Sequence, residues 1–194
     1  MLKRQFIGWI LYGLLCGASV SALYAQVMEV PVETQLQLFA KILSYDRNLH
    51  VRTGGRGVLG IIYQHTYKAS SSAKDDMLKS IGALPQVKMG DIPFRVELID
   101  LEGTDDLAAE LEKRGVTVAY ITPLRAFQLE TLLEATREQK ILTLTGVSSY
   151  VDGGVSISIG LLNQRPQILI NLPSSKAEGA EFNSHFLKLV KVLQ

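Results

Sequence analysis

Cysteine is nearly absent from this sequence, since Cys16 is the one cysteine among 194 residues. It lies in an N-terminal stretch that we expect to be removed, so the mature chain would contain no thiol. Such a chain cannot be held by disulfides and cannot sense redox conditions through a thiol. Histidine is also scarce, because His50, His65 and His185 are the only three, and their spacing is not that of metal ligands. The sequence therefore predicts stability from packing, no metal and no cofactor.

Motifs for catalysis are missing as well. No Gly-x-Ser-x-Gly elbow activates a serine. The acid pairs at residues 75–76 and 105–106 fall in or beside the first turns of expected helices, where acids interact favourably with the helix dipole. Residues 55–60 spell G-x-G-x-x-G, but a dinucleotide loop follows a strand and opens a helix, and here the glycines precede a strand. We therefore predict that the protein is not an enzyme.

Neither sign of charge is in excess. Twenty Lys and Arg residues face nineteen Asp and Glu residues, and no basic stripe or acidic tail stands out. Nucleic acid is therefore not an expected partner. The hydrophobic content of 47% is ample for the core of a single domain of this length.

Residues 1–25 differ from the rest of the chain. Lys3 and Arg4 precede an apolar stretch, and small residues follow it up to Ala25. This is the layout of a secretory signal peptide, although the segment is also just long enough to be an uncleaved membrane anchor. We favour cleavage, because the segment turns small and polar where an anchor would stay apolar. Residues 26–194 would then form one periplasmic domain.

Helix and strand patterns alternate along the mature chain. Helical spacing of apolar residues and helix-capping signals predict helices at residues 33–43, 73–81, 107–114 and 125–139, and from residue 173 onward. Short apolar or alternating runs predict strands at residues 56–63, 94–99, 116–121, 141–145, 155–159 and 168–172. The last two strands flank a turn-forming segment and read as a β-hairpin. The predicted fold is an α/β three-layer sandwich. Its mixed six-stranded sheet is mostly parallel, ends in an antiparallel hairpin, and is flanked by about five helices.

Polar side chains follow several of the predicted parallel strands. Open α/β sheets bind ligands beyond the carboxyl ends of their strands. Tyr67 and Ser71 follow the first strand, Arg125 follows the third, and Ser148 and Tyr150 follow the fourth. Arg125 can bind a carboxylate or phosphate bidentately, and Tyr150 can offer a flat amphipathic contact. We predict that these five residues bind a partner protein or a small polar or anionic ligand. The alternative is that they only stabilise loops.

Three passages resemble the YfiR-like family of small exported bacterial proteins. One is "LQLFAKILSYDRNL" leading into "GVLGIIYQ", and another is "GVTVAYITP". The third runs over residues 142–193, where a strand, a glycine pair, a hairpin ending at Asn171 and a closing helix follow in the family's order. The resemblance covers roughly residues 30–194.

The resemblance implies a function that the residues themselves do not spell out. Proteins of this family act in the periplasm as negative regulators, binding the periplasmic part of an inner-membrane diguanylate cyclase and holding down cyclic di-GMP synthesis and biofilm formation. Redox switching is not carried over, because the mature chain lacks cysteine. Another inner-membrane sensor as partner, a homodimer, and a small-molecule receptor resembling half of a solute-binding protein stay open as alternatives.

Overall fold

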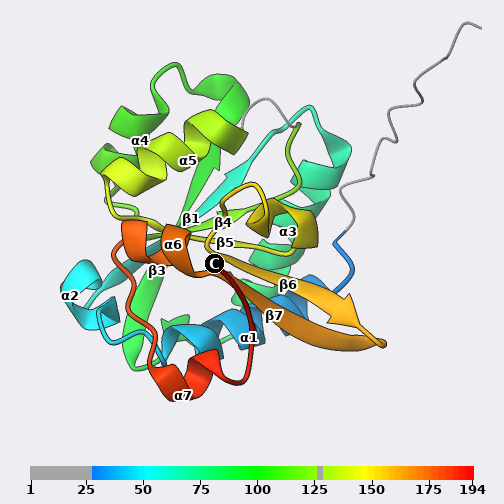
Figure 1. The fold of residues 1–194 in the computed structure, drawn as a ribbon. Helices are drawn as coiled ribbons and strands as arrows, with labels where there is room; N and C mark the ends of the chain where they lie inside the picture. Colours follow the sequence, from blue (N-terminus) through cyan, green and yellow to red (C-terminus); the bar gives the residue numbers. More distant parts are fainter. Residues whose placement is uncertain (1–27, 126–128) are drawn as a thin grey trace, which may run out of the picture.

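A computed structural model describes residues 28–125 and 129–194 (Figure 1). The expected signal peptide, residues 1–25, lies outside the described residues, so its cleavage stays a prediction. Within the described ranges, no helix is both long and apolar enough to cross a bilayer.

Helices and strands alternate as the patterns indicate. The helices are α1 Val32–Leu43, α2 Leu49–Thr53, α3 Lys68–Gly82, α4 Leu107–Arg114, α5 Leu129–Glu138, α6 Leu172–Ala177 and α7 Ser184–Leu187, with 3-10 turns η1 Leu101–Gly103 and η3 Ser148–Val151. The strands are β1 Gly57–Tyr63, β2 Lys88–Met89, β3 Ile92–Asp100, β4 Val118–Ile121, β5 Leu142–Thr145, β6 Ile157–Leu162, β7 Arg165–Asn171 and β8 Lys191–Leu193.

One mixed sheet carries the strands in the order β2-β3-β1-β4-β5-β6-β7-β8. The central run from β3 to β6 is parallel, while β2 with β3 and β6 with β7 are antiparallel. The mixed α/β sheet is confirmed, but eight strands replace the six predicted. The two additional strands, β2 and β8, have two and three residues, which is too short to show a periodic pattern.

The sheet separates two apolar cores, which gives the three layers. Alternate residues of a strand point to opposite faces. In β4, Tyr120 belongs to the core beneath α1 and α3, whereas Ile121 belongs to the core beneath α4 and α5. Figure 1 shows α4 and α5 on one side of the sheet and α1 and α7 on the other.

The ends of α4 and the turn of the hairpin agree with the sequence signals that predicted them. Asp106 caps α4 by accepting a hydrogen bond from the backbone N–H of Ala109 at 3.0 Å, and Gly115 ends the helix with a φ of 64°. The β6–β7 hairpin turns at Asn163 and Gln164, whose φ values of 52° and 62° fit a type I′ turn.

Two predicted helices are corrected at their ends. Helix α3 begins at Lys68 rather than residue 73, so the serines at 70–72, which precede the predicted helix, lie inside it, and residues 75–76 lie mid-helix rather than in its first turn. The predicted closing helix is broken after α6 at Gly179, which has a φ of 83°, and its last part is strand β8. Arg125 precedes α5 and is not helical, and residues 126–128 lie outside the described residues.

Candidate functional site

The strand order creates a switch point between β1 and β4. From β1 the chain passes to β3 on one side and then returns to β4 on the other. Loops from neighbouring carboxyl ends therefore diverge there, and open α/β sheets commonly bind ligands at such a point. The segments after β1 and β4 carry Tyr67 and Arg125, so both residues lie beyond the carboxyl ends of these strands, as predicted.

Buried polar residues lie beneath the loops at this switch point. Gln64, Ser70 and Thr122 are at most 1% exposed. The Thr122 hydroxyl donates to the carbonyl of Ile62 at 2.9 Å and lies 2.6 Å from the Ser70 hydroxyl, which accepts from the Gln64 N–H at 2.8 Å. The side-chain oxygen of Gln64 accepts from the backbone N–H of Arg125 at 2.9 Å. These bonds join the loops after β1 and β4 and fix the backbone that carries Arg125.

Arg125 and Tyr67 form the accessible surface at the switch point. The guanidinium carbon of Arg125 lies 6.0 Å from the centroid of the Tyr67 ring, which is within cation–π range. Arg125 is exposed and Tyr67 is half-buried. A guanidinium held in this way presents N–H donors to solvent, where they can bind a carboxylate or a phosphate.

Tyr150 lies beneath this surface. It is 5% exposed, and its hydroxyl donates to the carbonyl of Leu124 at 3.0 Å and accepts from the N–H of the same residue at 2.7 Å. Burial raises the pKa of Tyr150 to about 12, against a smaller lowering by the bond to Leu124. The ring expected to offer a flat amphipathic contact is thus buried, and the Tyr150 hydroxyl holds Leu124, the residue next to Arg125, in place.

Ser71 and Ser148 lie in turns that follow β1 and β5. The Ser71 hydroxyl donates to the carbonyl of Lys68 at 3.2 Å, within the first turn of α3. Ser148 begins η3 and packs on β6, because the Cβ of Ser148 would lie 2.9 Å from a Cβ added to Gly160. Of the five predicted residues, the structure joins Tyr67, Arg125 and Tyr150 through direct contacts or adjacent backbone.

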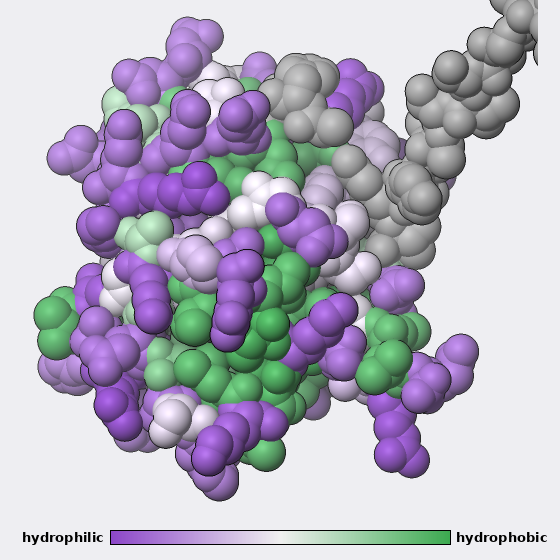
Figure 2. Space-filling model, viewed as in Figure 1, coloured by the Kyte–Doolittle hydropathy of each residue, from purple (hydrophilic) through white to green (hydrophobic). Residues whose placement is uncertain are grey.

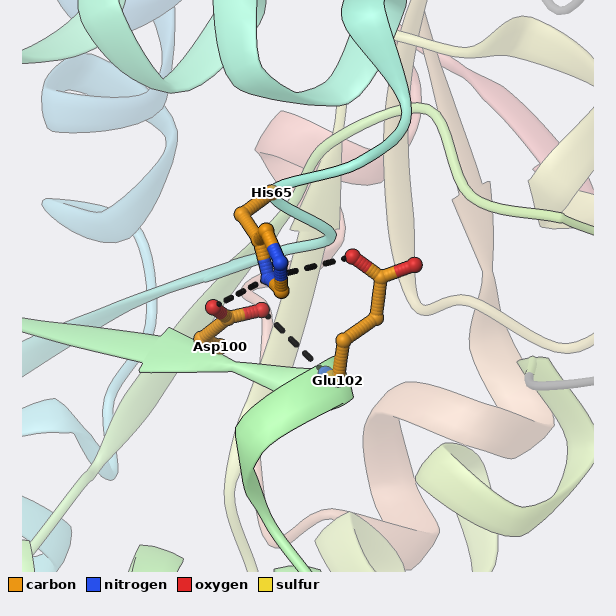
Figure 3. A group of neighbouring side chains, drawn as sticks. All are labelled: His65, Asp100 and Glu102. Carbon is orange, nitrogen blue, oxygen red and sulfur yellow. Dashed lines mark hydrogen bonds and ion pairs between the residues drawn. The ribbon is translucent and has the colours of Figure 1, made fainter.

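A cluster of His65, Asp100 and Glu102 lies at the carboxyl ends of β1 and β3 (Figure 3). Nδ1 of His65 is 2.8 Å from Oδ2 of Asp100 and 3.2 Å from Oε2 of Glu102. The hydroxyl and the N–H of Thr66 donate to Glu102, and these bonds, with smaller contributions from the charges of His65 and Arg125, lower the pKa of Glu102 despite partial desolvation.

Sequence reasoning missed this cluster. His65 is 35 residues from Asp100, and their contact depends on the pairing of β1 with β3. The available signal was that His65 and Asp100 each fall at the end of a predicted strand. Strand order along the sheet was the missing information.

A second surface lies at the other end of the sheet order, along the hairpin and β8. A groove of about 720 Å³ is lined by Leu162, Arg165, Lys188, Leu189 and Lys191, among others, and no acidic residue is in its lining. Leu162 is 53% exposed and Leu189 is 67% exposed. Figure 2 shows apolar side chains gathered in the middle of the view and again at the tip of the hairpin, between hydrophilic ones. Exposed apolar groups of this kind mark interaction surfaces.

The chain matches the model of one protein family. The model of the YfiR/HmsC-like family matches residues 71–191, which is more than half of the chain. The chain belongs to the YfiR/HmsC-like family. The matched region of this YfiR/HmsC-like protein includes Ser71, Arg125, Ser148 and Tyr150, and it begins after Tyr67.

Solved structures share the fold at low sequence identity. An ABC domain in complex with L-Trp from Streptococcus pneumonia has a TM-score of 0.59 at 13% identity, covering 84% of this chain and 62% of that one. A conserved domain protein from Vibrio cholerae has a TM-score of 0.52 at 14% identity, with 84% and 60% covered. A ligand-free, open substrate binding protein with adhesive properties from Clostridium difficile has a TM-score of 0.51 at 14% identity, with 85% and 60% covered. The YfiR/HmsC-like chain thus spans about three fifths of the length of these structures. No curated protein matches it.

Proposed function

We propose that this YfiR/HmsC-like protein is an exported, non-enzymatic regulator that binds the periplasmic domain of an inner-membrane signalling protein. The proposed partner is a diguanylate cyclase, whose cyclic di-GMP output the protein represses. The family match over residues 71–191 carries this proposal. Export rests on the composition of residues 1–25.

Two surfaces supply contacts suited to a protein partner. The switch-point surface presents the Arg125 guanidinium on the Tyr67 ring, and Ser71 and Ser148 lie in turns that follow β1 and β5. The hairpin groove presents Leu162 and Leu189 beside basic side chains, which favours an acidic segment of the partner. An aromatic–arginine pair and exposed leucines are groups that protein interfaces use.

Deletion of the gene should raise cyclic di-GMP and biofilm formation. Plasmid-borne wild type should restore both, whereas Arg125→Ala should fail to restore them at equal periplasmic protein level. Arg56→Ala is a matched control, because Arg56 is an exposed arginine that precedes β1 at the opposite edge of the sheet. Unchanged cyclic di-GMP in the deletion strain would count against a cyclase as partner.

The hairpin groove can be tested separately by direct binding. Leu162→Asp and Leu189→Asp place acids in a groove that favours an acidic partner, so each should weaken binding to the purified periplasmic domain. Leu84→Asp is the control, since Leu84 is 44% exposed and lies on the far side of the sheet order, after α3. If all three variants bind the periplasmic domain as tightly as the wild type, the groove is not part of the interface.

A small-molecule receptor is the second candidate. Two structures of similar fold are described as an L-Trp complex and as a substrate binding protein, and this chain covers 60–62% of their lengths. Arg125 at the switch point would then bind the anionic group of a ligand. A screen of small anions by thermal shift should yield a hit that Arg125→Ala abolishes, and an adjacent transporter operon would favour this alternative.

Compartment has an assay of its own. Mature protein in the soluble periplasmic fraction, beginning near Leu23 or Gln26, is the expected result. Full-length protein retained in membranes would show that the apolar N-terminal segment is an anchor.

A further inference from the structure

We propose that His65, Asp100 and Glu102 form a binding site for a divalent transition-metal ion, with Zn²⁺ as the fitting ion. Each residue offers one ligand atom, and the three atoms lie within 4.8 Å of one another (Figure 3). The residues come from two segments that the β1–β3 pairing brings to the same edge of the sheet.

The spacing of the ligand atoms suits an ion between them. Two ligands of one tetrahedral Zn²⁺ lie about 3.4 Å apart when each bond is about 2.1 Å. Nδ1 of His65 is 3.2 Å from the Glu102 carboxylate and 2.8 Å from that of Asp100. The imidazole therefore has to move away from Asp100 by about half an ångström. It is free to do so, because its side chain is 57% exposed.

Both carboxylates are already oriented by further bonds. Glu102 accepts from the N–H of Thr66 at 2.7 Å and from the Thr66 hydroxyl. The other oxygen of Asp100 accepts from the N–H of Glu102 at 3.2 Å. In metal sites, hydrogen bonds from outer groups orient the ligating carboxylates, and fixing the ligands in advance lowers the entropic cost of binding.

Charge and ligand type together select the ion. Two carboxylates balance a divalent cation, and one imidazole nitrogen with two oxygens suits Zn²⁺ better than the hard ion Mg²⁺, which prefers oxygen ligands alone. The cluster is open to solvent, so water can complete the coordination shell. Arg125 opposes the cation, because its charge reaches Glu102.

Isothermal titration of tag-free protein, purified from the periplasm, with ZnCl₂ tests the site. Wild type should bind one Zn²⁺, and His65→Ala and Asp100→Asn should each weaken binding by roughly tenfold or more. His185→Ala is the matched control, because it removes an exposed imidazole from α7, and its affinity should stay within about twofold of wild type. MgCl₂ should give no comparable heat.

A second measurement separates loss of the site from loss of the fold. In an NMR titration of the wild type with ZnCl₂, the imidazole signals of His65 should shift while those of His50 and His185 stay in place. Arg125→Ala should strengthen Zn²⁺ binding, because it removes the opposing charge. Absence of Zn²⁺ binding by the wild type, or binding that His65→Ala leaves intact, would overturn the proposal.

Discussion

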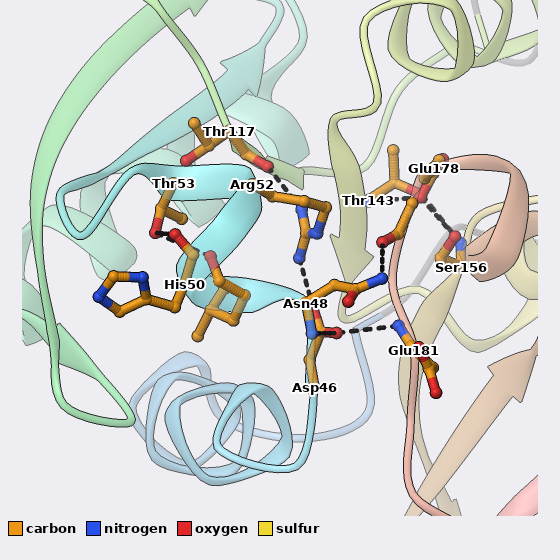
Figure 4. Close-up of polar contacts among 12 residues, drawn as sticks. Asp46, Asn48, His50, Arg52, Thr53, Thr117, Thr143, Ser156, Glu178 and Glu181 are labelled. Atoms are coloured by element: carbon orange, nitrogen blue, oxygen red, sulfur yellow. Dashed lines mark hydrogen bonds and ion pairs between the residues drawn. The ribbon is translucent and has the colours of Figure 1, made fainter.

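The two edges of the sheet carry similar charged groups in opposite surroundings. At the carboxyl edge, the side chains of His65 and Asp100 are 57% and 27% exposed. At the amino edge, those of Arg52 and Asp46 are 8% and 0% exposed (Figure 4). Exposed charges contribute little to stability and can be used for binding, whereas buried charges must be compensated within the fold. The carboxyl edge is therefore suited to function and the amino edge to holding the chain together.

The buried network joins distant parts of the sequence. Asp46 accepts from Nη2 of Arg52 at 2.6 Å and from the backbone N–H groups of Asn48 and Glu181, each at 2.9 Å. Nη1 of Arg52 donates to the carbonyl of Thr117 at 3.3 Å, just before β4. The segment after α6 is thereby attached to the loop between α1 and α2.

Glu178 is the second buried acid at this edge. Its carboxylate accepts from the N–H of Thr143 at 2.8 Å, from the Thr143 hydroxyl at 2.9 Å and from the Ser156 hydroxyl. Burial raises the pKa of Glu178 to about 7, and the hydrogen bonds from Ser156 and Thr143 oppose that rise. The C-terminal segment thus depends on a carboxyl group whose charge changes near neutral pH.

The largest effect is expected from Asp46→Ala. The substitution leaves the guanidinium of Arg52 buried without its counter-ion and leaves the N–H groups of Asn48 and Glu181 without an acceptor. Removing one partner of a buried ion pair costs about 3–5 kcal/mol, so the free energy of unfolding from urea titration should fall by that amount.

The exposed pair next to it is the control. Arg47 and Glu181 lie 3.5 Å apart with side chains 63% and 58% exposed, and Arg47→Ala should change the free energy of unfolding by about 1 kcal/mol or less. Equal losses for Asp46→Ala and Arg47→Ala would show that burial does not separate the two kinds of ion pair.

The next effect is a pH dependence that comes from Glu178. The folded state holds this proton more tightly than the unfolded chain, whose carboxyl pKa is 4.5. The stability contributed by the protonated group is therefore fully present below pH 4.5 and is lost as the pH rises through about 7. The difference amounts to about 3 kcal/mol.

Glu178→Gln isolates this contribution, because glutamine has a similar shape and does not titrate. Urea unfolding at pH 5 and pH 8 should show a loss of stability in the wild type that the variant lacks. Glu181→Gln is the control, because Glu181 is an exposed acid three residues further on, and it should keep the pH dependence of the wild type. A pH dependence that survives in Glu178→Gln would assign it to other groups.

Local sequence signals explain which parts of the fold were predictable. Asp106 begins α4 and Gly115 ends it through contacts with residues nearby in the sequence, so the sequence was sufficient to predict the ends of this helix. The helix predicted from residue 173 onward was wrong in its last part. Phe182 and Phe186 have helical spacing, yet the backbone turns left-handed at Gly179, and β8 forms by pairing with β7. That pairing is a tertiary interaction, which short-range periodicity does not contain.

For the candidate site, the position of the residues was predictable from the sequence, but their exposure and contacts were not. Strand ends placed Tyr67, Arg125 and Tyr150 at the correct edge of the sheet. Whether a side chain there is exposed, like that of Arg125, or buried, like that of Tyr150, depends on packing between distant segments. The contact of His65 with Asp100 likewise needed the strand order, so it could not be foreseen from spacing.

A smaller loss of stability is expected from Tyr150→Phe. Tyr150 is the buried residue among those predicted to bind a partner or ligand, and the substitution removes its hydroxyl. The substitution removes both bonds to Leu124 and leaves its N–H and carbonyl without these partners. An unsatisfied buried polar group costs about 1–3 kcal/mol, so stability should fall within that range. Regulation should survive in the folded fraction, because the ring still packs beneath the loop. Full stability with lost regulation would make Tyr150 a contact residue instead.

The smallest effect on stability is expected from His65→Ala, at the exposed edge. Its imidazole is mostly in solvent, where ion pairs with Asp100 and Glu102 are screened by water and salt. In metal-free buffer the melting temperature should change by about 2 °C or less. With ZnCl₂ present, the wild type should melt at a higher temperature than without it, because an ion that binds the folded state stabilises that state, and His65→Ala should lose this increase. A large loss of stability in metal-free buffer would mean that the cluster belongs to the scaffold, as the buried network at the amino edge does.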